Sequence, residues 1–248
     1  MNKRHKFALV QFPFLAIIFF FIFNAVAIYY FPGSEKSIIG FQSDYYSFTH
    51  NFFSELGAFT TSPDELKGAV KIDNTLSMLL FNASLIIVGC SIMLFYNKLK
   101  YFFERKKDSA KTIYYSNLAR PIGMVTGSLF AGVGLIPHDL HFLAHVFCAH
   151  GAFLTLWVLS MVHVLAVFHS RHLTNKYALG YLIFFLILAI YLGIIFLGPR
   201  IGPGLLYKES DLILQVVAQK IIVLTFIVSM LIQLYGINKM FKASDKIN

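Results

Sequence analysis

Long apolar runs separated by short polar segments dominate the pattern of hydrophobic positions along this chain. Six runs stand out, at residues 7–31, 74–96, 117–136, 140–168, 178–198 and 212–235. Each is close to the ~20 residues that a helix needs to cross a bilayer. None shows the alternation of apolar and polar residues that is typical of a membrane barrel. The pattern therefore predicts an all-α fold, a bundle of six transmembrane helices that forms a single integral membrane domain over residues 1–248.

The composition agrees with a membrane protein and excludes a soluble domain of useful size. Of the 248 residues, 57% are hydrophobic and 13% are charged, whereas a soluble domain carries about 25% charged residues. The first run follows Lys3, Arg4 and Lys6, as the core of a signal peptide would. Its apolar core is longer than the ~7–15 residues of such a peptide, so we interpret it as the first span.

The basic residues indicate how the helices are oriented. They gather at the N-terminus, between the second and third spans, between the fourth and fifth spans, and in the C-terminal tail. Such segments face the cytoplasm, so we expect both termini inside and the acidic loop of about 40 residues at 33–73 outside. Dispersed over four segments, these residues favour contact with anionic membrane lipid and argue against nucleic acid. We expect a multi-pass protein of a bacterial or archaeal cytoplasmic membrane.

The outer loop is too long for a simple connection and too apolar for a solvated tail. Its stretch "FTHNFFSELGAF" at 48–59 is rich in phenylalanine, and we expect it to fold over the outer end of the bundle. The stretch "TSPDEL" at 61–66 predicts a helix start, with Ser62 as the cap and Pro63 at the first position. Asn82, in the second span, is expected to form a hydrogen bond between helices.

The third span contains four glycines, Gly123, Gly127, Gly132 and Gly134. Small residues at such spacings let helix backbones approach closely in lipid, so we interpret these glycines as packing residues.

The stretch "GLIPHDLHFLAHVFCAHGAF" at 134–153 contains four of the nine histidines. If it is helical throughout, steps of about 100° per residue place His138, His141 and His145 on one face about 60° wide. Asp139 and His150 then lie on the adjoining strip. The spacing predicts one polar face at the outer end of the fourth span.

This constellation has a chemical and a structural interpretation. His141 and His145, one turn apart, are suited to bind a divalent ion, and Asp139 adds an oxygen ligand. His138 and His150 are further candidate ligands. Zinc held there would lower the pKa of a bound water and generate hydroxide. Alternatively, Asp139 favours the helix dipole and the histidines form a polar face that bonds to other helices.

Two more polar groups are candidates for a site. Ser54 and Glu55 are surrounded by phenylalanines in the outer loop, although a capping serine and a surface glutamate are an alternative interpretation. Lys220, next to Gln219, lies near the middle of the sixth span, where a lysine costs roughly 2.5–3.5 kcal/mol to insert. We expect it to face the bundle and to pair with Glu55 or Asp139, either as an anchor in a site or as a structural ion pair.

Four short stretches resemble a known family. They are "FSELGA" after the first span, "LLFNASLIIVGC" in the second, "GVGLIPHDLHFLAH" between the third and fourth, and "AQK" in the sixth. Together they are similar to the six-helix membrane family called domain of unknown function 998, which is related to the Frag1/DRAM-like membrane proteins. The family pattern Gly-x-x-Pro-x-Asp followed by His maps onto Gly134, Pro137, Asp139 and either His141 or His145. The usual arginine of the last span is Lys220 here, so the guanidinium fork is missing.

The resemblance implies a function that involves lipids. Frag1-type relatives include proteins implicated in remodelling the acyl chains of lipid anchors. The set of Ser, Asp and His-x-x-x-His is also similar to that of the CREST membrane hydrolases, such as the alkaline ceramidases, which have seven spans and resemble zinc-dependent amide or ester hydrolases. The likeness to CREST proteins is one of parts and not of layout.

We therefore expect a membrane-embedded, zinc-dependent hydrolase or an acyltransferase that acts on an ester or amide bond of a lipid in the extracytoplasmic leaflet. Ser54, Glu55, Asp139, His145 and Lys220 are the candidate catalytic residues. In a metal-free version, His145 is the base and Ser54 accepts the acyl group. Alternatives are a non-enzymatic protein that binds or senses lipid or acts as a scaffold, and a transporter of protons or metal ions. No inverted repeat is visible in the sequence to favour a transporter.

Overall fold

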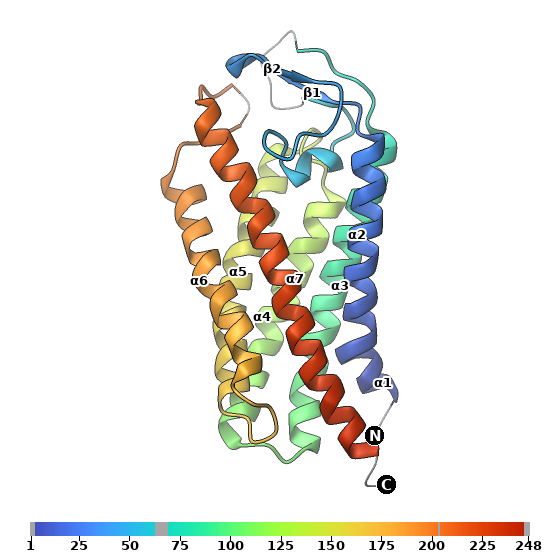
Figure 1. Cartoon of the computed structure of the whole chain (residues 1–248), viewed down its shortest axis with the longest axis vertical. Coiled ribbons are helices and arrows are strands. Elements are labelled where there is room, and N and C mark those ends of the chain that lie inside the picture. The colour runs from blue at the N-terminus through green and yellow to red at the C-terminus, as the bar shows by residue number, and fades with distance from the viewer. Residues whose placement is uncertain (1–2, 63–68, 203, 246–248) are drawn as a thin grey trace.

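The computed structural model describes residues 3–62, 69–202 and 204–245, and it is built almost entirely from helices (Figure 1). Six helices in this part of the chain are long and apolar enough to cross a membrane, as predicted. The helices, in chain order, are α1 (Lys3–Lys6), which continues through a π-helical segment (Phe7–Gln11) into α2 (Phe12–Tyr30), then α3 (Thr75–Arg105), α4 (Ala110–Leu135), α5 (Phe142–Phe168), α6 (Lys176–Leu197) and α7 (Glu209–Asp245).

Several helices extend beyond the apolar runs that predicted them. α3 has 31 residues, a length of about 46 Å at 1.5 Å per residue, which exceeds the ~30 Å hydrocarbon core of a bilayer. Its extra turns carry the basic residues that follow the second run. The apolar run therefore marks the part of a helix that lies in lipid, and the helix continues beyond it because nothing in the polar sequence terminates it.

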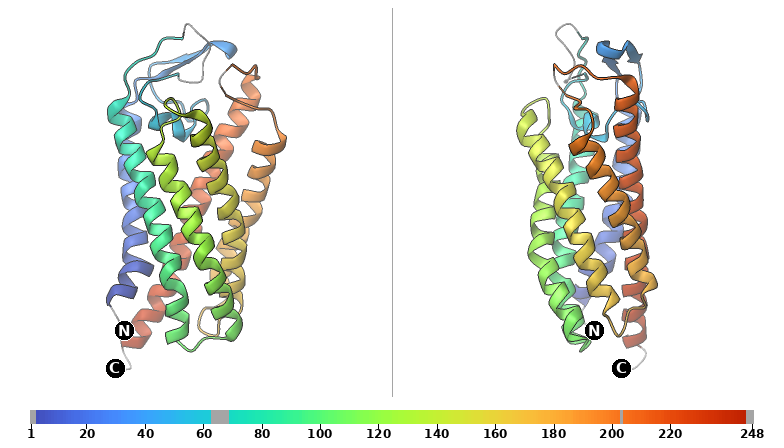
Figure 2. Two further views of the ribbon diagram at one scale, coloured as in Figure 1. Left: turned by 180° about the vertical axis from the view of Figure 1, so that it is seen from behind. Right: turned by 90° about the vertical axis from the view of Figure 1, so that its left-hand side faces the viewer.

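Helices that are consecutive in the chain pack side by side, and the loosely packed pair of α2 and α7 completes the ring. α1 and the C-terminal part of α7 lie at one end of the bundle, which we call the termini end (Figure 1). The segment between α2 and α3 lies across the opposite end, which we call the loop end, and two further views show the same arrangement (Figure 2).

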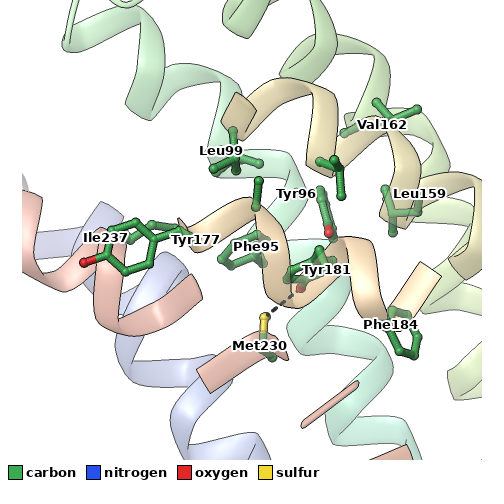
Figure 3. Close-up of a cluster of buried hydrophobic side chains, with 14 of the residues drawn as sticks. Phe95, Tyr96, Leu99, Leu159, Val162, Tyr177, Tyr181, Phe184, Met230 and Ile237 are labelled. Atoms are coloured by element: carbon green, nitrogen blue, oxygen red, sulfur yellow. Dashed lines mark hydrogen bonds between the residues drawn. The ribbon is translucent and has the colours of Figure 1, made fainter. Parts of the chain in front are cut away.

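A large cluster of aromatic and aliphatic side chains fills the bundle toward the termini end (Figure 3). Tyr181 of α6 is fully buried in it, and its hydroxyl donates a hydrogen bond of 3.2 Å to the sulfur of Met230 in α7. Phe95 of α3 and Leu159 of α5 are likewise completely buried. This cluster closes the termini end, and the functional candidates lie beyond it, toward the loop end.

The glycines of α4 pack as predicted. A Cβ on Gly127 would meet the carbonyl oxygen of Gly89 in α3, and a Cβ on Gly89 would meet that of Gly127. A Cβ on Gly123 would instead meet the side chain of Tyr96 in α3. Because neither backbone can move away without separating α3 from α4, these positions leave no room for a side chain.

The segment between α2 and α3 departs from a purely helical fold. A short antiparallel hairpin joins β1 (Ser34–Lys36) to β2 (Phe41–Ser43). Gly40 occupies its turn with φ of 68°, a conformation that favours glycine. A 3₁₀ helix, η3 (Phe53–Gly57), follows. The helix start predicted at 61–66 falls largely on residues 63–68, outside the described residues.

Candidate functional site

The 3₁₀ helix η3 inserts into the loop end of the bundle and is held there by α3. Leu56 and Ala58 are fully buried. Three polar side chains of α3 and its N-cap donate to carbonyl groups of this segment: Asn74 to Ala58 (2.9 Å), Ser77 to Leu56 (3.2 Å) and Asn82 to Gly57 (3.2 Å). Asn82 was predicted to bond to another transmembrane helix, but it bonds to the inserted loop. These bonds satisfy a backbone that would otherwise be buried without partners.

Glu55 is the centre of a buried polar network. Its carboxylate accepts hydrogen bonds from Lys36 Nζ (3.0 Å), Asn51 Nδ2 (2.7 Å) and the backbone N–H of Phe52 (2.8 Å). The side chains of Glu55 and Lys36 are only 5% and 7% exposed. A buried charge requires such complete pairing. Glu55 is thus neither a surface residue nor open to a substrate, and its contacts fix the position of Ser54, its neighbour in η3.

α7 holds the same segment from the other side. Lys220 Nζ donates to the carbonyl oxygen of Asn51 (2.7 Å) and lies 5.4 Å and 5.1 Å from the ring centroids of Tyr46 and Phe53. Gln219 Oε1 accepts from the backbone N–H of Phe53 (2.9 Å). Lys220 faces the bundle, as expected, but its direct partner is a carbonyl group. Glu55, one of the two carboxylates expected to pair with Lys220, pairs with Lys36, and the other, Asp139, accepts from Thr60.

The turn between α4 and α5 overturns the helical arrangement predicted for residues 138–141. α5 begins at Phe142, and His141 is its N-cap, with its ring accepting from the N–H of Ala144 (3.3 Å). His138 and Asp139 therefore lie in a turn, where a spacing of 100° per residue does not apply. His141 is exposed, so it does not share a face with His145.

The two histidines that the fold brings together are His138 and His145, each about 5% exposed. Their ring centroids lie 5.3 Å apart. His145 Nδ1 donates to the carbonyl oxygen of Ile136 (2.6 Å), since a carbonyl can only accept. His138 hydrogen-bonds to the backbone of Ser54, and burial, the largest influence, lowers its pKa below the usual 6.5, although the nearby Glu55 acts in the opposite direction.

Asp139 and His150 point to separate places. Asp139 Oδ2 accepts from the N–H (3.0 Å) and hydroxyl (3.4 Å) of Thr60, which ties the α4–α5 turn to the outer loop. The ring of His150 packs edge-on against Phe196 of α6, 5.2 Å away.

The predicted zinc ligands lie in different surroundings. Among the described residues, no group of three or more His, Cys, Asp or Glu side chains is arranged to hold a metal ion. His141, His145 and Asp139 do not fit a common ion, because His141 is the exposed cap of α5 and Asp139 bonds to Thr60. Zinc binding stays a prediction of the sequence.

A cavity of about 510 Å³, the loop-end cavity, lies between η3, α5, α6 and α7. The polar residues that line it are Ser54, His138, His145, His150, Arg200, Gln215 and Gln219. Its other walls are largely aromatic and aliphatic, with Phe142, Phe153, Tyr191 and Phe196 among them. Such a cavity, mostly apolar with a few converging polar groups, is typical of a small-molecule site. It brings together Ser54, His138, His145 and His150 from the predicted set, and leaves Glu55, Asp139, His141 and Lys220 around it.

Sequence reasoning missed three residues of this region. Lys36 and Asn51 complete the network of Glu55, and Arg200, between α6 and α7, lines the cavity. An available signal was the solitary Glu55 among phenylalanines, which needs a nearby cation in a buried setting.

Comparison with protein-family models, with curated proteins and with solved structures finds no match to this chain.

Proposed function

We propose that this protein binds a lipid of the extracytoplasmic leaflet in the loop-end cavity and cleaves or transfers the acyl group of an ester or amide bond. One observation carries the proposal: Ser54, a potential nucleophile, and His145, a potential base, line the same cavity, and His138 bonds to the backbone of Ser54. They come from η3, α5 and the α4–α5 turn, three elements that only the folded chain brings together.

The charge distribution supports an outward-facing cavity. The termini end carries the basic segments of the sequence, including Lys98, Lys100, Arg105, Lys106 and Lys107 around the end of α3. Basic segments stay on the cytoplasmic side of a membrane. The loop end and its cavity then face the outer leaflet of a cytoplasmic membrane, where the polar head of a lipid can reach Ser54.

In its neutral form, His145 has the tautomer that a base requires. Because Nδ1 donates to Ile136, the neutral ring carries its proton there, and Nε2 holds the basic lone pair. This bond also fixes the orientation of the ring. His138, whose pKa burial keeps below 6.5, is neutral near pH 7 and positions the backbone of Ser54.

The proposed reaction proceeds through an acyl-enzyme. Ser54 Oγ attacks the carbonyl carbon of the ester or amide and transfers its proton to His145 Nε2. The C–O or C–N bond then breaks, and the leaving alcohol or amine takes that proton from His145. Water, or a second alcohol or amine, next attacks the acyl-serine while His145 accepts its proton and returns it to Ser54 Oγ. Water as the acceptor gives hydrolysis, and the other acceptors give acyl transfer.

The buried network has a positioning role in this proposal. Glu55, Lys36 and Asn51 hold the start of η3, and Gln219 and Lys220 hold the residues just before Ser54. The resemblance to the domain of unknown function 998 family, and to the parts of CREST hydrolases, points to the same lipid chemistry.

The test is turnover by the purified protein in lipid nanodiscs. Phospholipids, lipid amides and acylated peptides with a radiolabelled acyl chain are supplied, and released or transferred label is measured. We expect Ser54→Ala and His145→Gln each to lower the rate about 10²- to 10⁴-fold. Ser43→Ala, in β2, and His172→Gln, exposed between α5 and α6, do not line the cavity and serve as matched controls with wild-type rates. Full activity in Ser54→Ala would eliminate the acyl-serine.

A second candidate is lipid binding without chemistry, the alternative considered from the sequence. It is favoured by the partner of His145, which is a backbone carbonyl and not the carboxylate of a catalytic triad. The carboxylates of Glu55 and Asp139 are engaged elsewhere. Co-purified lipid detected by native mass spectrometry, without turnover of any lipid class above, would favour this candidate.

A further inference from the structure

Two smaller cavities continue from the loop-end cavity into the bundle. The first, about 90 Å³, shares five lining residues with the loop-end cavity: Ser54, His145, Ala149, Phe153 and Gln219. The second, about 80 Å³, shares five lining residues with the first: Phe20, Leu85, Phe130, Phe153 and Val223. We call these two cavities together the apolar channel. Because each shares walls with the next, the three cavities lie in series from the loop end toward the middle of the bundle.

The character of the walls changes along this path. The loop-end cavity has histidine, glutamine and arginine side chains. The inner part of the apolar channel is lined by aliphatic and aromatic side chains of α2 to α5 and α7, including Ile17, Val88, Phe226 and Met230, with Ser91 as its polar exception. A cavity lined in this way does not hold water well. A path that is polar at one end and apolar at the other matches an amphiphile.

The length of the path matches one leaflet. On α7, Gln219 lines the loop-end cavity and Met230, eleven residues later, lines the innermost part. Eleven residues of helix rise about 16 Å, about half of the ~30 Å hydrocarbon core. A chain that runs from the level of Gln219 to the level of Met230 is therefore about as long as one leaflet is deep.

We infer that the apolar channel holds a single acyl chain of an outer-leaflet lipid, with the ester or amide end of that chain beside Ser54 and His145. The placement of that end rests on the proposed function, whereas the chain itself rests on the walls and length of the channel. The small volumes of the two cavities, about 80 and 90 Å³, leave no room for a second chain. The polar head then occupies the loop-end cavity, within reach of Arg200 and Gln215.

Two residues control the dimensions of this path. Phe153 lines all three cavities, and its ring packs edge-on against Phe130 (6.1 Å) and Tyr191 (5.2 Å), so it sets the width where the polar part meets the apolar part. Val223 lines both parts of the channel and also a groove of about 290 Å³ between α2 and α7. This groove, at the loosely packed closure of the ring, gives a chain lateral access from the bilayer.

Photo-crosslinking locates the chain directly. The probe is palmitoyl lysophosphatidylcholine with a diazirine at the terminal carbon, added to the purified protein in nanodiscs and mapped by peptide mass spectrometry. We expect label on the buried residues Ser91, Ile92 and Met230. Outward-facing residues of α7 that line none of these cavities, such as Ile221 and Val228, report contact with bulk lipid. Label confined to such outward-facing residues would overturn the inference.

A matched pair of variants tests the channel by filling it. Val223→Phe places a larger side chain in the channel, and Val228→Phe makes the same change on the exposed side of α7, where Val228 is 47% exposed. We expect Val223→Phe to weaken binding of the palmitoyl probe about tenfold, since overpacking a filled space costs on this scale. Binding of a lauroyl probe should change less, and Val228→Phe should bind both probes as wild type does. Equal effects of the two variants would contradict the channel.

Phe153→Ala is the complementary variant and does not rely on overpacking. Removing the ring widens the junction, so stearoyl probes should gain affinity relative to lauroyl probes. An unchanged preference in both Phe153→Ala and Val223→Phe would overturn the inference, even if one of them folds poorly.

These results separate the channel from the proposed chemistry. Crosslinks on the buried residues without turnover of any lipid would support the channel and refute the acyl-enzyme. Turnover that depends on Ser54, with crosslinks only on outward-facing residues, retains the enzyme and refutes the channel.

Discussion

Removal of the Glu55 carboxylate tests whether the buried network holds the loop end together. Glu55→Ala deletes one charge-assisted and two further hydrogen bonds. It leaves the ammonium group of Lys36, whose side chain is 7% exposed, without its counter-ion. Breaking a buried pair in this way costs about 3–5 kcal/mol. The loss falls on the insertion of η3 and not on the spans, because the pair joins two parts of the outer loop.

Amide hydrogen exchange measures this loss where it occurs. The N–H groups of Asn51, Phe53, Glu55 and Ala58 donate within the inserted segment or to α7, and they exchange when it opens. A cost of 3–5 kcal/mol corresponds to exchange that is faster on the order of 10²- to 10⁴-fold. Peptides from the middle of α5 should exchange as in the wild type.

Two further variants make the result decisive. Glu209→Ala removes an exposed partner of His50, whose Nε2 lies 3.0 Å from a carboxylate that is 58% exposed. Such surface pairs contribute at most about 1 kcal/mol. The double change Lys36→Met with Glu55→Leu leaves no unpaired charge and should recover much of the loss. If Glu55→Ala exchanges no faster than Glu209→Ala, or the double variant is as labile as the single one, the network is not what holds η3.

Three other predictions concern packing, the intramembrane lysine and pH. Gly127→Leu forces a side chain against a backbone carbonyl of α3, so we expect unfolding in detergent to become easier by about 1–3 kcal/mol, whereas Gly193→Leu, with open space around it, should unfold as the wild type does. Lys220→Met removes a charged donor from the carbonyl of Asn51 and should cost about 1.5–3 kcal/mol, seen as faster exchange of the residues before η3 with unchanged exchange in α4. Burial lowers the pKa of His138 in the folded protein below the 6.5 of the unfolded chain. Between the two pKa values the unfolded chain binds more protons, so the contribution of His138 to stability is complete above about pH 6.5 and falls as the pH drops toward the folded pKa. Melting temperatures of His138→Gln should lack this decline, and an identical decline in the variant would show that His138 does not cause it.

Particular residues show where sequence reasoning succeeded and where it stopped. The close approach of Gly127 to α3 followed from small residues spaced along an apolar helix, a local signal. The prediction that His138, His141 and His145 share one helical face was wrong because it applied helical spacing to His138 and His141. Both residues precede the first residue of α5, and helix boundaries are poorly determined by local sequence. The partner of Glu55 was also misjudged. Lys36 reaches it through a hairpin whose register no short-range pattern specified.

The sequence by itself determined the class of fold, with six apolar helices in the part of the chain that the structure describes, because each span is selected by the transfer of its own segment into an apolar medium. Only the tertiary structure decided which sides of these helices meet. In lipid, the side of a helix that faces the bundle and the side that faces the acyl chains are both apolar. The hydrophobic pattern therefore does not indicate which side faces the bundle. The pairing of His138 with His145, the burial of Lys36 beside Glu55 and the continuation of the loop-end cavity into the apolar channel all depend on that choice of sides.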